Sequence, residues 1–474
     1  MGKVEMERGG GARLRPPLPA FLPWLRLSLV TLTFAGVMAG LVALARTPAV
    51  KPFLPREYFS VLLVGHVDLA FVAWVLLMGA VLWQVAVPIG MEEGKGGAEL
   101  ASGMNGGRGG LYFSAAGVVL MILSLLVGRG TPVLSHYIPY LAHPVFALGL
   151  GLLFLGLSGP AFRALGAGSG NGDPVRWGAR VSALSYLLSL FILLVSLLRL
   201  PGIEGTLEER VNAVFWGVGH GLQFAYTSAM VTAWLILLRA RGREMVRPDM
   251  GRFLFALYPL GVAVLALGYL ARDPLSLLRS SFPSDVMSWG LGVPTAGFLL
   301  LTVRPLVGEL GRGERLDFRI TSLLMSVIVY TLGGAMAVFG DLSQQTTRIP
   351  AHYHAVLGGV TIAFMGLTYE LLRREGFRPG EFWARVQPYL YGAGVVLFAL
   401  GMFWGGVHGA PRKTPGAEWA RDPVALLALN LMGVGALLAV AGGLAYLLVA
   451  ARAAFSPPRR PVAESSDIPG RGGS

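Results

Sequence analysis

The chain has 474 residues, 54% of them hydrophobic and 14% charged, whereas a soluble domain usually carries about 25% charged residues. This composition excludes an ordinary soluble globule, and the formal net charge of +13, which alone would suit nucleic-acid binding, is placed along the chain in a way that argues against that partner. Cysteine is absent, which excludes disulfides, thiolate-held iron–sulfur clusters and thioether-attached haem.

Twelve apolar runs follow one another along the chain, each about as long as the hydrocarbon core of a bilayer requires, roughly 20 residues. Lipid offers the backbone no hydrogen-bond partners, so we expect every run to be a helix. A transmembrane β-barrel would show short alternating segments instead. The sequence therefore predicts an all-α, polytopic membrane protein of about twelve spans. The runs are residues 24–45, 57–89, 111–128, 139–162, 181–198, 213–238, 253–271, 288–303, 320–340, 352–372, 386–407 and 423–451.

Two tails flank the predicted membrane domain, which we place at residues 21–453. Residues 1–20 are basic, too polar for a signal peptide and not followed by a cleavage site, so we expect a cytoplasmic tail and a retained first helix. Residues 454–474 are rich in proline, serine and glycine, and we expect a second, disordered cytoplasmic tail.

Lysine and arginine are distributed unequally between the two sides of this topology. The segments on the side of the termini hold 26 of them and the opposite loops hold 12. Cytoplasmic loops of membrane proteins carry such an excess, so we expect both termini in the cytoplasm of a bacterium, with the spans in its inner membrane and surrounded by lipid. The basic balance then reports topology and implies no nucleic-acid partner.

All seven histidines fall in the outer half of the predicted bundle or in its outer loops. Ionisable residues inside a bilayer are costly and usually functional, and neutral imidazole is a common ligand of metals and haem iron. A lone histidine within a span can equally be a packing residue, and histidines in loops are most simply solvated. They are His66, His136, His143, His220, His352, His354 and His408.

The sharpest local feature is Ala351-His352-Tyr353-His354 at the start of the tenth run. Residues two apart on a helix point about 200° apart, so the two imidazoles face opposite flanks of one span. That helix could ligate two cofactors, one on each side. His66 lies at matching depth in the second run, which favours a cofactor site over packing.

The chain resembles subunit I of the haem–copper oxidase superfamily, which includes cytochrome c oxidases, cbb3-type oxidases and nitric oxide reductases. Four motifs carry the resemblance: Ala-His-Tyr-His-Ala-Val-Leu at 351–357, Gly65-His66, Gly219-His220, and Val293-Pro294-Thr295. The histidine pair of the tenth run is the specific element. The resemblance implies a subunit-I-like helical bundle with haem sites near the outer side of the membrane.

The resemblance also implies roles for individual residues. His66 and His354 would be the two axial ligands of a low-spin haem b, and His352 the proximal ligand of a second haem. His220 matches the first histidine of the copper site, or of the non-haem iron site in nitric oxide reductases. Separately from the resemblance, Arg348 lies one turn before His352, where it is either a partner of a haem propionate or an ordinary interfacial arginine.

Three positions depart from the family pattern. The family places two adjacent histidines in the seventh span to complete the copper site, and here those positions are Tyr269 and Leu270. The eighth-span lysine of a proton pathway falls at Phe298. His220 therefore reads as a vestigial copper-site position, and copper is not expected.

Three functions remain open. The first, which we favour, is a haem-binding subunit that passes electrons in a respiratory complex, with other subunits and a cytochrome c-like or quinol donor as partners. The second is an active terminal oxidase or nitric oxide reductase whose second metal is held by His220 with His136 or His143. The third is a cofactor-free membrane transporter that uses its histidines as a proton relay.

Overall fold

A computed structural model describes residues 19–50, 55–86, 97–167, 172–312, 315–343, 345–415 and 422–458. Within these residues twelve helices are long and apolar enough to cross a membrane. The prediction of an all-α protein with about twelve spans is therefore confirmed. Most of the two predicted tails lies outside the described residues, so the expectations for the tails stay predictions.

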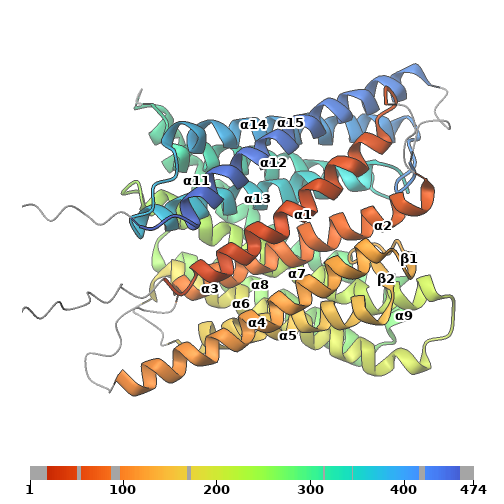
Figure 1. Ribbon diagram of the computed structural model, residues 1–474, viewed down its shortest axis with the longest axis horizontal. Helices are drawn as coiled ribbons and strands as arrows, with labels where there is room; N and C mark the ends of the chain where they lie inside the picture. The colour runs from red at the N-terminus through yellow and green to blue at the C-terminus, as the bar shows by residue number, and fades with distance from the viewer. Residues whose placement is uncertain are drawn as a thin grey trace, which may run out of the picture.

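The first six spans alternate in direction through the bundle (Figure 1). Span 2 is continuous but contains a π-helical segment, η1, between α2 and α3. A short antiparallel hairpin, β1 and β2, joins spans 3 and 4. The elements are α1 (Leu22–Arg46), α2 (Arg56–Val67), η1 (Asp68–Trp74), α3 (Val75–Ala86), α4 (Gly97–Val127), β1 (Thr131–Val133), β2 (Tyr140–Ala142), α5 (Pro144–Gly166), α6 (Pro174–Arg199), η3 (Leu200–Gly202) and α7 (Leu207–Arg239).

The remaining six spans complete the bundle, with α10 and α11 together forming span 8. The short α9 lies between spans 7 and 8, at the same end as the hairpin (Figure 1). The elements are α8 (Pro248–Ala271), α9 (Pro274–Leu278), α10 (Phe282–Gly290), α11 (Gly292–Leu310), α12 (Phe318–Phe339), α13 (Arg348–Arg374), α14 (Glu381–Val407) and α15 (Pro423–Ala454).

Helix starts explain why several spans are longer than their apolar runs. Thr206 and Glu209 form a capping box, in which each side chain bonds the backbone of the other, so span 6 begins at Leu207 rather than at 213. Asp173 caps α6 in front of a proline, and Asp422 caps α15 in the same way. Polar caps and first turns carry no hydropathy signal, so the apolar pattern detects only the membrane-embedded part of each helix.

Spans 6 and 10, α7 and α13, form the centre of the bundle. They are the most buried of the twelve, at 94% and 89% of their apolar windows, whereas α1, α11 and α15 are largely exposed on the outside. The central helices carry His220, His352 and His354. The histidine-bearing helices are therefore surrounded by protein rather than by lipid.

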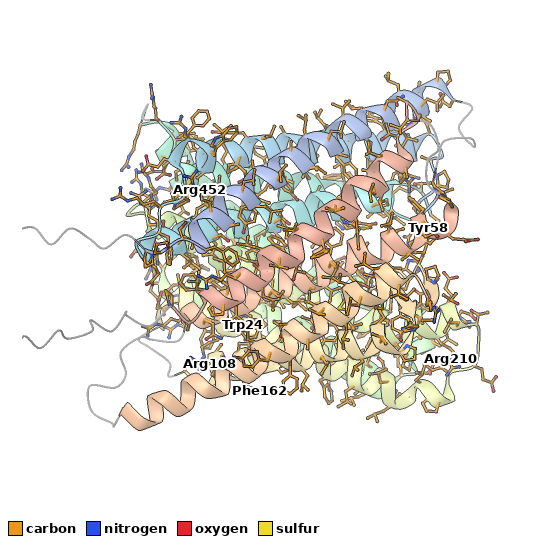
Figure 2. The ribbon with its side chains drawn as sticks, in the orientation of Figure 1. Trp24, Tyr58, Arg108, Phe162, Arg210 and Arg452 are labelled. Carbon is orange, nitrogen blue, oxygen red and sulfur yellow. The ribbon has the colours of Figure 1, made fainter. Side chains whose placement is uncertain are left out.

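The two ends of the bundle differ in charge and content. Arg26 near the start of span 1 donates two hydrogen bonds to the carbonyl of Ala454 at the end of span 12, so the membrane domain begins and ends on one side. We call this the α15 end; Arg452 marks it in Figure 2. The opposite end carries β1 and β2, is marked by Tyr58 and Arg210 in Figure 2, and is called the hairpin end.

Buried ion clusters tie the spans together at the α15 end. The Glu309 side chain, 1% exposed, contacts the guanidinium groups of Arg241, Arg243 and Arg312. Glu370 pairs with Arg374 on its own helix and with Arg319 of span 9. The two acids are buried but several of their arginine partners are a quarter to nearly half exposed, so solvent screens these pairs and each contributes less than a fully buried pair.

Candidate functional site

His66 of span 2 and His354 of span 10 face each other near the hairpin end. Their ring centres lie 6.2 Å apart and their planes differ by 15°. Metal–imidazole bonds are about 2.0–2.1 Å long, so two rings that share one metal through facing nitrogens have centres roughly 6 Å apart. The two side chains that the sequence pairs are therefore brought to a spacing that suits one shared metal ion.

Backbone carbonyls orient the two histidines of span 10. Nδ1 of His354 donates to the carbonyl of Pro350 at 2.7 Å, and Nδ1 of His352 donates to the carbonyl of Gly333 in span 9 at 2.8 Å. A neutral imidazole that donates from Nδ1 keeps its lone pair on Nε2. This arrangement is typical of metal-ligating histidines, whose second nitrogen is held by a backbone or carboxylate acceptor.

The space beside these rings is lined by aromatic side chains. Phe71 contacts the rings of both His66 and His354, and Phe398 of span 11 contacts His354 at 4.9 Å between centres. His66, His352 and His354 lie within their spans, and each residue keeps a minor exposed fraction. The aromatic side chains beside them are apolar surfaces of the kind that contact a planar macrocycle.

A basic cluster lies near these histidines at the hairpin end. Arg46 lies within electrostatic range of His354; it donates from Nη2 to Pro411 at 2.9 Å, while its Nε has no hydrogen-bond partner among the described residues. Arg412 and Lys413 follow in the loop between spans 11 and 12. We define Arg46, Arg412 and Lys413 as the basic cluster.

Glu208 acts on Arg412 and Lys413 electrostatically, but it does not offset the effect of their burial. Burial, together with the charge of Arg412, lowers the pKa of Lys413 to about 7. Burial also lowers the pKa of Arg412. Burial disfavours the charged forms of these side chains, and a nearby anion would stabilise them. Carboxylates such as haem propionates are one class of anion that binds such groups.

Arg348 is engaged elsewhere. Its Nη1 lies 3.4 Å from Asp341 and 3.3 Å from the carbonyl of Gly340, and its Nε donates to Thr346. The basic cluster, which the sequence reasoning missed, offers the Nε of Arg46, which is unpartnered among the described residues, while Lys413 already donates to the carbonyls of Leu134 and Ser135. Its signal was two adjacent cations, Arg412 and Lys413, in a loop on the side where positive charge is scarce.

His220 of span 6 is fully buried, and both of its ring nitrogens have partners. Nδ1 donates to the carbonyl of Trp216 at 2.8 Å, which leaves Nε2 as the acceptor. The hydroxyl of Tyr137, from the hairpin loop, lies 3.2 Å from Nε2 and is the donor. Tyr137 therefore occupies the coordinating position of His220.

Tyr269 and Leu270, the two seventh-span positions, differ in burial. Tyr269 is buried, and its ring lies against Gly217, where an added Cβ would come within 2.3 Å of it. Leu270 is 46% exposed and faces outward. Phe298 is fully buried and packs on Phe255. None of these three side chains offers a nitrogen donor to His220.

The other three histidines have local partners. Nδ1 of His143 accepts from the backbone N–H of Val145, so this ring caps α5. His408 pairs with Asp422. His136 accepts from Arg412 at 3.0 Å and packs on Trp216, which also contacts His220. Among the described residues no three histidine, aspartate or glutamate side chains form a group suited to a metal ion.

A family model decides the identity of the fold. The model described as cytochrome c and quinol oxidase polypeptide I matches residues 20–445. The chain belongs to this family. The match covers all twelve spans except the last part of span 12, so the oxidase resemblance is confirmed over residues 20–445.

Similar proteins agree with this assignment. An uncharacterized protein of Aquifex aeolicus is 29% identical over 75% of this chain and 85% of its own length. An uncharacterized protein of Rickettsia prowazekii is 25% identical over 91% of this chain and 95% of its own length. Cytochrome c oxidase subunit 1 of Thermus thermophilus is 24% identical over 64% of this chain and 60% of its own length.

A solved structure has the same fold. It is a haem–copper terminal oxidase dimer with a TM-score of 0.72, and the alignment covers 93% of this chain and 84% of that chain. The sequence identity is 18%, so the likeness shows the fold alone. The oxidase-family bundle is thus established, while the chemistry of this chain depends on its own residues.

Proposed function

We propose that this oxidase-family chain is a haem-binding subunit that passes electrons in a respiratory complex. The facing pair of His66 and His354, 6.2 Å apart between ring centres, carries the proposal. A haem held by two imidazoles supplies one-electron transfer between ferric and ferrous iron. His66 and His354 would be its axial ligands, and we assign it as a low-spin haem b.

Three further observations support the fit. The Nδ1 contact of His354 leaves its Nε2 lone pair available, while Phe71 and Phe398 supply apolar walls. The basic cluster supplies cationic donors for propionates, including the unpartnered Nε of Arg46. A charged propionate beside Lys413 would favour the protonated form of its amine and so offset the effect of burial on its pKa.

His352 is the proposed ligand of a second haem on the other flank of span 10. Its Nδ1 is fixed by Gly333 and its Nε2 is left as the lone-pair nitrogen. Because residues two apart on a helix point about 200° apart, His352 and His354 serve separate sites on one helix. The hydrogen bond to Gly333 holds the His352 ring in one orientation against span 9.

The copper site is proposed to be incomplete. Copper needs several nitrogen or oxygen donors in fixed geometry, and His220 has Tyr137 on its Nε2. His143 caps a helix and His136 accepts from Arg412, which disfavours the alternative oxidase or nitric oxide reductase that would recruit them. Electron passage needs neither copper nor the missing lysine at Phe298.

The proposal places the chain in a bacterial inner membrane with both termini in the cytoplasm and the histidine sites near the outer side. Other subunits of the complex, with a cytochrome c-like protein or a quinol as donor, are the expected partners. The excess of lysine and arginine at the α15 end, where Arg241, Arg243 and Arg452 lie, supports this orientation.

Visible spectra of the oxidised and reduced purified protein, with haem and metal quantification, test the function. We expect the sharp reduced α-band of a bis-histidine haem and substoichiometric copper. A colourless protein would favour the transporter. About one copper or non-haem iron per chain, with consumption of oxygen or nitric oxide, would favour the active enzyme.

A further inference from the structure

A cavity opens at the α15 end, far from the histidines. Its volume is about 590 Å³, and it lies where span 10 ends, span 11 begins and span 12 ends. Its walls combine an aromatic side chain, Trp383, with the apolar Leu448 and Val449. Two arginines, Arg378 and Arg452, complete the lining (Figure 2 labels Arg452).

The charge of this cavity is uniformly positive. No acidic side chain is among the residues that line it. Neither the guanidinium of Arg378 nor that of Arg452 makes an ion pair or side-chain hydrogen bond within the described ranges of the chain. A neighbouring cavity of about 440 Å³ differs, because Asp317 and Glu381 line it beside its arginines. The second cavity therefore offers acidic partners to its arginines, whereas the lining of the first offers none.

Three helix ends meet at the cavity, and their fields partly oppose one another. Gly380, which lines the cavity, is the N-cap of α14 and provides no side-chain cap, although Glu381 follows it in the first turn. The first N–H groups of α14 favour an anion and the C-terminus of α13 disfavours one, so the two arginine side chains carry the argument for a negatively charged ligand. The opposite effect of the C-terminus of α15 is reduced, because Arg26 already donates two hydrogen bonds to the carbonyl of Ala454.

The cavity lies at the ends of three spans. This is the level at which lipid headgroups and the aromatic residues of membrane proteins are expected. Trp383 is 53% exposed and Leu448 63% exposed, so the apolar side of the cavity faces the lipid. A soluble anion would use the arginines but leave this apolar wall uncovered.

We propose that the cavity binds an anionic phospholipid of the leaflet at the α15 end. Arg378 and Arg452 bind the phosphate ester, and the acyl chains lie along Leu448 and Val449 beside Trp383. Basic pockets between transmembrane helices on the cytoplasmic side recognise anionic headgroups in this way. The inference is independent of the haem assignment, because it uses neither the histidines nor the basic cluster.

Native mass spectrometry of the full chain in mild detergent tests the site, with short-chain phosphatidylglycerol and phosphatidylcholine as probes. We expect retained phosphatidylglycerol in preference to phosphatidylcholine. The double variant Arg378→Gln/Arg452→Gln should weaken phosphatidylglycerol binding by about fivefold per guanidinium. Arg247→Gln is the matched control: this arginine is exposed at the same end, and the described residues give its side chain no ion pair. It should leave binding unchanged.

Fluorescence gives a second readout that does not depend on lipid retention. Phosphatidylglycerol with brominated chains should quench Trp383, seen as the difference between the parent protein and Trp383→Phe. Equal binding of the two lipids, or full binding by the double variant, overturns the proposal. Competition by inorganic phosphate with no quenching of Trp383 would assign the arginines to a soluble phosphate instead, which also overturns it.

Discussion

The hydroxyl of Tyr137 lies 3.2 Å from Nε2 of His220, on the nitrogen through which this histidine would bind a metal. The opposite nitrogen is fixed by the carbonyl of Trp216, so the ring cannot offer a lone pair without losing one of these contacts. A tyrosine from the hairpin loop thus satisfies a buried imidazole that has no second or third histidine beside it.

The first prediction concerns copper. We expect copper well below one atom per chain in the purified protein and in Tyr137→Phe, because removal of the hydroxyl frees only one donor and copper needs several. Elemental analysis after dialysis against a mild chelator measures this. Stoichiometric copper in the parent protein would show that other side chains complete the site, and His136 would then be the first residue to substitute.

The second prediction concerns the low-spin haem. His66→Ala and His354→Ala should each abolish the sharp reduced α-band. That band requires imidazole ligands on both faces of the haem, and each variant leaves only one. Visible spectra of detergent-purified variants measure the loss. His408→Ala is the control, since this histidine pairs with Asp422 in a loop. A full α-band in both ligand variants would place the ligands elsewhere.

The third prediction separates the two flanks of span 10. His352→Ala should reduce the haem content from two per chain to one while leaving the α-band of the His66–His354 haem in place. The two rings point to opposite sides of the helix, so loss of one should not disturb the other. Pyridine haemochrome quantification gives the count. An unchanged haem content would make His352 a packing residue held by Gly333.

The fourth prediction is a pH dependence from the hairpin loop. Burial, together with the positive charges of Arg412 and Lys413, lowers the pKa of His136 to about 4 from an ordinary 6.5. At a pH between these two pKa values, His136 is protonated in the unfolded chain and neutral in the folded chain. The free energy of unfolding therefore falls as the pH falls.

His136→Gln should therefore flatten the loss of stability between pH 6.5 and 4, measured as Tm in detergent across that range. The comparison is the difference between parent and variant at each pH, which removes the contributions of other groups. Identical slopes in the two proteins would show that His136 titrates normally in the folded state.

The fifth prediction is the orientation in the membrane. The sequence contains no cysteine, so single introduced cysteines are unambiguous reporters. Arg210→Cys at the hairpin end should react with an impermeant thiol reagent on intact cells, and Arg247→Cys at the α15 end should react only after lysis. Both arginines are exposed. The reverse pattern would invert the topology and move the histidine sites to the inner side.

Hydropathy, a local signal, was sufficient for the twelve spans, and the two-residue spacing of His352 and His354 placed their side chains on opposite flanks of one helix. The pairing of His66 with His354 was implied by the resemblance to the oxidase family. The partners of His220 were not predictable in the same way. Tyr137 lies 83 positions away in the chain, and nothing in its surroundings distinguishes it from other tyrosines at span ends.

The basic cluster was missed for a similar reason. Arg46 ends span 1 and Lys413 follows span 11, so their proximity to His354 depends on how distant spans pack. Arg348 looked better placed, being one turn before His352, but Asp341 and Gly340 hold its guanidinium. The spacing of two residues on a helix predicts the direction of their side chains well. It does not predict which other groups from distant segments lie close enough to bind those side chains.

The π-helical segment of span 2, Asp68–Trp74, follows directly after His66 and its helix α2. A π-turn holds one residue more than an α-turn, and each α-helical residue rotates the chain by about 100°. The half of span 2 that carries His66 is therefore out of phase with the half that carries Trp83. Any comparison of this span with an unbroken α-helix needs a one-residue gap near Asp68, or it will match His66 or Trp83 to the wrong face of the corresponding helix.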